Sequence, residues 1–302
     1  MDKFLIFPKW YQWICKRIFL ALLPTVILFA LQHWIWFIAG AIVKQYPASV
    51  FTEPLTPLDK FHITDGNSWF LIFYGLSYVY WLVMPIVIYS IYGPKLYYRF
   101  VWTLVFMYLF GGIIFIAFPT SSKILYTDSD FSVTGTDIFS KFIENMRVHN
   151  SGVCALPSFH VIGTYSIFLI QRSSLSKKYS KNISKKTNIS LLIFSSIFNV
   201  MVGMSTFMTH QHFILDFPSA ILCCEIVYFI MLKLEKKPNI TQRLFTNLNV
   251  ALAFENAQNT TWGGNLCTKI MNLKHRTFWY VLIIILYLVV NLGLLYSFSI
   301  GL

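Results

Sequence analysis

Residues 69–92 read WFLIFYGLSYVYWLVMPIVIYSIY and contain no Asp, Glu, Lys or Arg. A helix needs about 20 mainly apolar residues to cross a bilayer, so this stretch predicts a transmembrane helix. Six further runs of similar character lie at residues 17–43, 100–118, 156–170, 189–205, 213–232 and 278–299. The chain is therefore predicted to be an all-α polytopic membrane protein.

The composition excludes an ordinary soluble domain. Hydrophobic residues make up 56% of the 302-residue chain and charged residues only 12%, whereas about a quarter of the residues in soluble domains are charged. The net charge of +12 comes from Lys and Arg residues between the apolar runs, as in cytoplasmic loops. The densest basic block, residues 177–186, has no ladder of interleaved aromatic residues, so we expect no nucleic-acid partner. The five cysteines have the spacing of neither a zinc site nor a disulfide framework.

The predicted helices divide the chain into three parts. Residues 1–232 are expected to form a six-helix membrane core, residues 233–277 a polar cytoplasmic linker, and residues 278–302 a C-terminal transmembrane helix. Most Lys and Arg residues fall in segments that are cytoplasmic if the N-terminus is inside, which matches the known bias of membrane proteins. The fourth and sixth helices then begin on the non-cytoplasmic face, towards a periplasm or a lumen.

Two short motifs mark the beginnings of these two helices: residues 154–160, CALPSFH, and residues 209–216, THQHFILD. In the second motif, His212 and Asp216 are four residues apart on a predicted helix and so share one face. A carboxylate there accepts the proton of one imidazole nitrogen and leaves the other as a nucleophile or base. The alternative is an ordinary contact on a helix surface.

The first motif predicts an anion site. Pro157 is expected in the first helical turn, where its missing N–H does no harm. The N–H groups that follow, together with the Ser158 hydroxyl, would face an anion that His160 could also reach. The alternative is a plain Ser cap beside an interfacial His.

Together the two motifs supply two histidines, an orienting aspartate and a donor-rich helix start. Phosphoryl transfer through histidine needs one His as nucleophile and a second as proton donor to the leaving group. We predict no cofactor and no metal site, although two His and one Asp could ligate zinc.

The paired motifs resemble those of the type 2 phosphatidic acid phosphatase superfamily. Pro157-Ser158-Phe159-His160 is followed about fifty residues later by His212-x-x-x-Asp216, and the resemblance covers roughly residues 69–232. It implies a six-helix membrane core with the site at one face. It also implies that His212 is the nucleophile that forms phosphohistidine, that Asp216 orients it, that His160 protonates the leaving group and that Ser158 contacts phosphate.

The chain departs from the phosphatases of that superfamily at two basic motifs. They carry an Arg after the serine that opens the later motif, but here Thr206 follows Ser205. They also carry an earlier Lys…Arg-Pro motif, whose spacing Lys95 and Arg99 do not match. The pattern is instead similar to the inositol phosphorylceramide and sphingomyelin synthase branch, and residues 118–120, FPT, before a long loop also resemble the inositol phosphorylceramide synthase-like branch.

The missing cations leave the phosphate-binding charge to other residues. Lys123 and Arg147, in the predicted outer loop of residues 119–153, are the candidates, with solvated loop charges as the alternative. The prediction is a membrane enzyme that transfers or hydrolyses the phosphate-ester head group of a bilayer lipid, in the manner of an inositol phosphorylceramide synthase. The alternatives are a lipid phosphate phosphatase and a non-catalytic lipid-binding or transport relative.

Overall fold

The computed structural model describes residues 9–45, 51–52, 56–122, 125, 129–149, 156–175 and 184–235. The predicted C-terminal helix of residues 278–302 and nearly all of the predicted linker of residues 233–277 lie outside this part of the chain. The division into three parts therefore stays a prediction.

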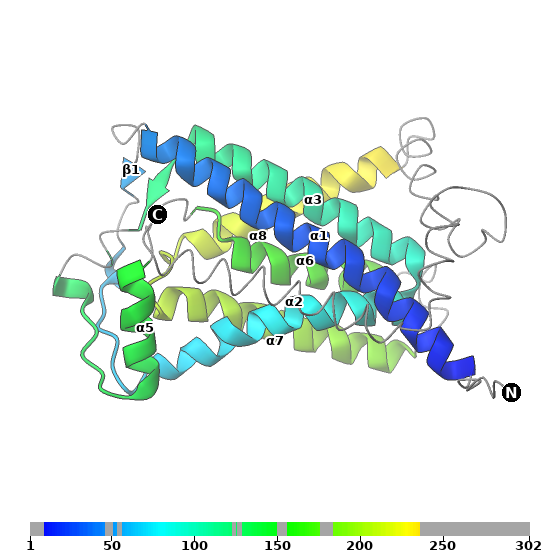
Figure 1. Ribbon diagram of the computed structural model, residues 1–302, viewed down its shortest axis with the longest axis horizontal. Coiled ribbons are helices and arrows are strands. Elements are labelled where there is room, and N and C mark those ends of the chain that lie inside the picture. Colours follow the sequence, from blue (N-terminus) through cyan, green and yellow to red (C-terminus); the bar gives the residue numbers. More distant parts are fainter. Residues whose placement is uncertain are drawn as a thin grey trace, which may run out of the picture.

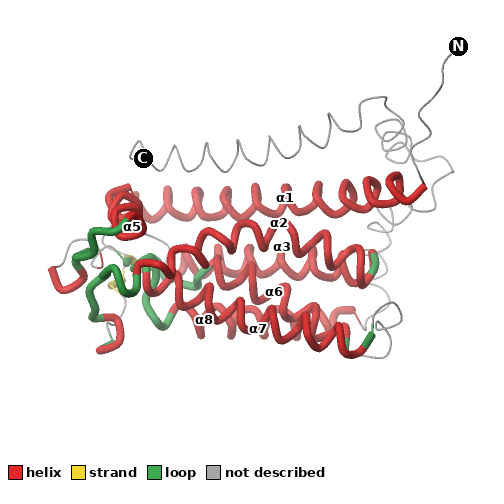
Figure 2. Tube along the Cα trace, turned by 90° about the horizontal axis from the view of Figure 1, so that it is seen from below, coloured by secondary structure: helices red, strands yellow, loops and turns green. Residues whose placement is uncertain are grey.

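Six helices run side by side in a bundle (Figures 1 and 2). They are α1 (Lys9–Gln45), α2 (Leu71–Tyr92), α3 (Pro94–Ala117), α6 (Phe159–Ser174), α7 (Lys185–Met208) and α8 (Asp216–Glu235). Within the described residues, all of these except α6 are long and apolar enough to cross a membrane. The prediction of an all-α polytopic membrane protein is confirmed.

Helix α6 is the centre of the bundle. It packs against α2, α3, α7 and α8, although it has only 16 residues. Gly163 allows α2 to come close, because a Cβ atom at this position would lie 2.6 Å from Nε1 of Trp81. A short helix that is enclosed on several sides does not need the uniform apolar surface of a lipid-facing span, and α6 carries the first motif at its beginning.

Polar side chains pair with one another between the helices. The Tyr80 hydroxyl donates to Ser195 Oγ at 2.6 Å, and the Thr164 hydroxyl donates to Asn199 Oδ1 at 2.7 Å. Further along the bundle, Asn188 Oδ1 accepts hydrogen bonds from Tyr92 and Ser174. Hydrogen bonds of this kind help to join helices where lipid supplies no hydrophobic driving force between them.

Short elements gather at one end of the bundle, which we call the capped end. They are β1 (Phe51–Thr52), η2 (Pro57–Asp59), η3 (Ser68–Phe70), β2 (Thr120–Ser121), η4 (Ser129–Phe131) and α5 (Ile138–His149); β1 and α5 are labelled in Figure 1. The predicted outer loop of residues 119–153 thus contains a helix, α5.

Two segments that are distant in sequence join across the capped end. Strands β1 and β2 pair in parallel. The Ile63 N–H donates to the Ser132 carbonyl at 3.1 Å, and Asp65 Oδ1 accepts the N–H groups of Thr136 and Asp137. Residues 56–70 and 129–149 therefore form one connected cover over the ends of the helices.

Candidate functional site

The first motif places Ser158 at the N-cap of α6. Its backbone is extended, with φ −64° and ψ 116°, and its side chain makes no capping hydrogen bond. The hydroxyl is fully buried and has no hydrogen-bond partner within the described residues. Pro157 precedes the N-cap, so the prediction that it lies in the first helical turn is wrong. A buried hydroxyl without a partner is costly in a folded protein, which makes Ser158 a candidate ligand-binding residue.

The second motif lies in a tight turn between α7 and α8. The N–H of Gln211 donates to the Thr206 carbonyl at 3.0 Å, and the N–H of His210 donates to Phe207 at 2.9 Å. His210 has a φ of 55°, so the turn is a Schellman motif with His at the left-handed position that Gly usually occupies. The turn reverses the chain immediately before His212.

His212 and Asp216 contact each other across this turn. His212 Nδ1 lies 2.9 Å from Asp216 Oδ2, which also accepts the N–H of Phe213 at 3.1 Å. Asp216 is fully buried and is the first residue of α8, so His212 precedes the helix. The contact is as predicted, but the expected reason, a shared helix face, is wrong. The carboxylate stabilises the tautomer with a proton on Nδ1, which leaves the lone pair on Nε2.

His160 faces His212 from the first turn of α6. The centroids of the two imidazole rings are 6.1 Å apart and the rings are nearly perpendicular. His160 Nδ1 is buried and has no hydrogen-bond partner in the part of the chain that the structure describes. The two histidines predicted from separate motifs are therefore neighbours, with Ser158 two residues before His160.

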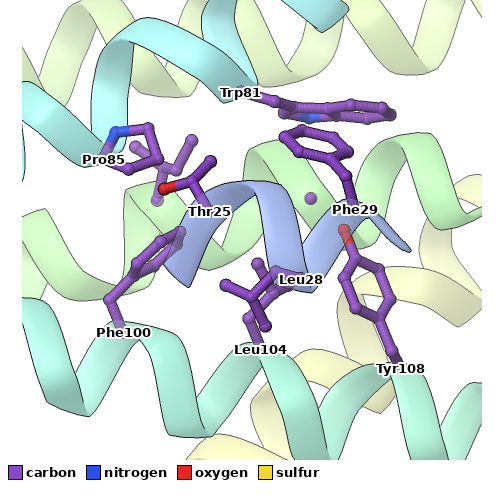
Figure 3. Close-up of a pocket in the computed structure, with 10 residues that line it drawn as sticks. Thr25, Leu28, Phe29, Trp81, Pro85, Phe100, Leu104 and Tyr108 are labelled. Carbon is purple, nitrogen blue, oxygen red and sulfur yellow. The ribbon is translucent and has the colours of Figure 1, made fainter. Parts of the chain in front are cut away.

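Aromatic rings of α2 enclose His160. The centroids of Tyr74, Tyr78 and Trp81 lie 4.6, 5.7 and 5.4 Å from the imidazole centroid, and the Trp81 ring stacks on it. Trp81 also lines a small apolar cavity, where Phe29 of α1 packs against the indole ring (Figure 3). These contacts fix the orientation of the His160 ring.

Of the two residues predicted to supply phosphate-binding charge, the structure describes only one. Lys123 lies outside the described residues. Arg147, on α5, is buried and donates from Nη1 to the Phe131 carbonyl at 2.7 Å and from Nη2 to the Leu125 carbonyl. Burial, followed by the nearby charge of Arg147, lowers the pKa of His210 from 6.5 to about 3. Arg147 therefore brings positive charge close to the turn that carries His212, while its guanidinium binds loop carbonyls.

Sequence reasoning missed Asp59 and His33. Asp59 is buried and its Oδ1 accepts the N–H of Ile214 at 2.9 Å; its signal was the capping-box pattern of residues 56–59, TPLD. His33 lies on α1 with Nδ1 2.8 Å from the carbonyl of Phe29, whose ring packs against Trp81. Its signal was an ionisable residue inside a transmembrane run.

Comparison with known families gives one result. A family model described as the PAP2 superfamily matches residues 59–229, which is more than half of the chain. The match begins at Asp59 and includes Ser158, His160, His212 and Asp216. Neither the curated proteins nor the solved structures compared with the chain give a match.

Proposed function

The chain belongs to the PAP2 superfamily, the type 2 phosphatidic acid phosphatases, and from this premise we propose that His212 attacks the phosphorus of a lipid phosphate ester. Membership of the superfamily supports a phosphatase-type activity on lipid phosphoesters. The observation that carries the proposed mechanism is the position of His212, held at Nδ1 by buried Asp216 and facing His160.

The proposed reaction has two steps. In the first, the lone pair of His212 Nε2 forms a bond to phosphorus while the bond from phosphorus to the leaving oxygen breaks, and protonated His160 gives its proton to that oxygen. In the second, the oxygen of water or of an alcohol attacks phosphorus, its proton passes to His160, and the P–N bond breaks. Asp216 stabilises the charge that the His212 ring acquires.

Ser158 and the first turn of α6 are the proposed phosphate ligands. The buried Ser158 hydroxyl would donate to an equatorial oxygen, and the exposed N–H groups at the beginning of a helix favour an anion. Arg147 already donates to two carbonyls, so its proposed contribution is its positive charge. Lys123 is proposed as a second source of charge.

Beyond attack on a lipid phosphate ester, we propose that the head group is transferred to an alcohol. Thr206 stands where phosphatases of the superfamily carry an arginine, and its carbonyl accepts the N–H groups of Gln211 and His212. The position thus supports the turn through its backbone and supplies no charge. Hydrolysis is the second candidate function, favoured by the superfamily match. The Lys and Arg distribution of the sequence supports a site on the non-cytoplasmic face.

The test uses the purified full-length protein in mixed micelles with two donors, phosphate-labelled dioctanoyl phosphatidic acid and phosphatidylinositol labelled in its phosphate. Each donor is supplied with and without ceramide. Labelled phosphate released from phosphatidic acid, or labelled inositol phosphate released from phosphatidylinositol, identifies hydrolysis. Labelled inositol phosphorylceramide formed from phosphatidylinositol and ceramide identifies transfer. His212→Ala is expected to lower either rate by a factor on the order of ten thousand or more, because it removes the nucleophile.

The control variant is His62→Ala, since His62 is an exposed histidine of the capped end that contacts Ser132. It should keep the activity of the unchanged protein. Denaturing the protein during turnover with detergent at alkaline pH, where a P–N bond to histidine survives, should trap label on the unchanged protein and on His62→Ala but not on His212→Ala. Turnover by a correctly inserted His212→Ala protein would contradict the mechanism, and binding of donor without turnover by the unchanged protein would favour the lipid-binding alternative.

A further inference from the structure

Asp59 is a buried acidic residue whose two oxygens hold two different segments. It is 1% exposed. Its Oδ2 accepts both the N–H and the hydroxyl of Thr56, each at 2.7 Å, which closes the short helix η2. Its Oδ1 accepts the N–H of Ile214 at 2.9 Å, across 155 residues of sequence.

The hydrogen bond from Ile214 to Asp59 is made in the middle of the turn that carries the second motif. Ile214 is two residues from His212 and two from Asp216. The Schellman hydrogen bonds fix the beginning of this turn, and the bond from Phe213 to Asp216 fixes its end. Asp59 supplies a third support, and it comes from outside the α7–α8 segment.

The segment that carries Asp59 is itself anchored. The Phe61 ring packs against Phe207 and His210, with centroid distances of 5.1 and 4.4 Å. Ile63 exchanges backbone hydrogen bonds with residues 132 and 134 of the cover over the bundle. The residues that follow Asp59 are therefore fixed against both the turn and the cover, so Asp59 can define the position of Ile214.

We propose that Asp59 is a positioning residue that fixes the His212–Asp216 turn for attack on the lipid phosphorus. The inference rests on the proposed function, and it adds a residue from outside both sequence motifs. An ionised carboxylate makes stronger hydrogen bonds than a neutral acceptor. A displacement of about 1 Å in a reacting group can cost about a hundredfold in rate, so a support at Ile214 acts on the rate of the chemical step.

The experiment compares Asp59→Asn with the matched control Asp137→Asn in the full-length protein. Asp137 is a second acidic residue of the capped end, bonded to Ser68 and Ser140. Asn keeps the shape of Asp, but its single carbonyl oxygen cannot accept the hydrogen bonds of both Thr56 and Ile214, so the link between the two segments is broken. Asp59→Asn should lower kcat on dioctanoyl phosphatidic acid or phosphatidylinositol by about 10- to 100-fold with little change in KM, whereas Asp137→Asn should leave both close to their original values.

Hydrogen–deuterium exchange of the peptide that spans residues 206–217 gives a readout that does not need activity. Exchange in this peptide should increase in Asp59→Asn and stay unchanged in Asp137→Asn. Thr56→Val, which removes one donor to Asp59 and keeps the shape of the side chain, should change kcat and exchange in the same direction by a smaller amount.

Exchange and kcat together distinguish a failure of the positioning role of Asp59 from a failure of the proposed function. Unchanged exchange and unchanged kcat in Asp59→Asn would overturn the positioning role, as would a rise in KM at constant kcat. If Asp59→Asn increases exchange but the unchanged protein turns over neither donor, the structural role of Asp59 at Ile214 would be supported and the proposed function would be overturned.

Discussion

The interior of the bundle and the candidate site at its capped end differ in what their buried polar groups contact. Between the helices, several polar side chains pair with one another, as Tyr80 does with Ser195 and Thr164 with Asn199, although Thr103 Oγ1 and the Gln171 amide are buried there without a partner among the described residues. At the candidate site, Ser158 Oγ and His160 Nδ1 are buried without a hydrogen-bond partner in the described part of the chain. The pairs join the helices, whereas Ser158 and His160 are candidates to bind a ligand because His160 also faces His212.

The supports of the two regions also differ. The helices pack along their lengths, whereas the His212 turn is held by a few hydrogen bonds that its N–H groups donate to Thr206, Asp216 and Asp59. A lost interhelical pair should therefore lower stability, and a lost group at the site should lower activity. The following predictions sharpen this difference, beginning with the largest expected effect.

Replacing His160 by Ala should lower the rate on a lipid phosphate ester by about a hundred- to ten-thousandfold, which is the range for a general acid. The loss should be much smaller on para-nitrophenyl phosphate, because its leaving group needs no proton. The measurement is kcat/KM for both substrates, with Tyr78→Phe as a control that keeps the ring against His160. An equal loss on both substrates would assign His160 to phosphate binding instead.

The two buried serines Ser158 and Ser195 should respond oppositely to replacement by Ala. Ser158→Ala should lower kcat/KM by about 10- to 100-fold and leave the unfolding midpoint unchanged, since its hydroxyl makes no capping bond. Ser195→Ala should keep activity but lower the free energy of unfolding by about 1–3 kcal/mol, because the Tyr80 hydroxyl loses its partner. Thermal unfolding in detergent and initial rates test both; a stable, fully active Ser158→Ala protein would remove Ser158 from the site.

The smallest effect concerns His210 and acid. Its pKa is lowered from 6.5 to about 3 in the folded protein, so between these values the unfolded chain binds a proton that the folded chain does not. Stability should therefore fall as the pH decreases from 6.5 towards 3. His210→Asn, which keeps a residue suited to the left-handed position, should remove this part of the loss. Unfolding midpoints of the two proteins across this pH range give the comparison, and parallel curves would contradict it.

The long helices could be predicted because apolar length and charge are local properties of the sequence. Both helices that carry the motifs begin three residues later than predicted, at Phe159 and Asp216, since the motifs form caps and turns rather than helix. The pairing of His212 with Asp216 was predicted from the wrong geometry. The bond from Asp59 to Ile214 could not be predicted, because a contact across 155 residues depends on how the cover lies on the bundle.

Helix α6 is shorter than the hydrocarbon core of a bilayer. At about 1.5 Å per residue its 16 residues span about 24 Å, less than the roughly 30 Å of a bilayer hydrocarbon core. Its two ends cannot both reach the boundaries of an unthinned bilayer. In the proposed reaction, a lipid donor reaches His160, in the first turn of this helix, by diffusion in the plane of the bilayer, so the rate should depend on the mole fraction of donor lipid in the surface. Dilution with inert lipid at constant total donor should slow turnover.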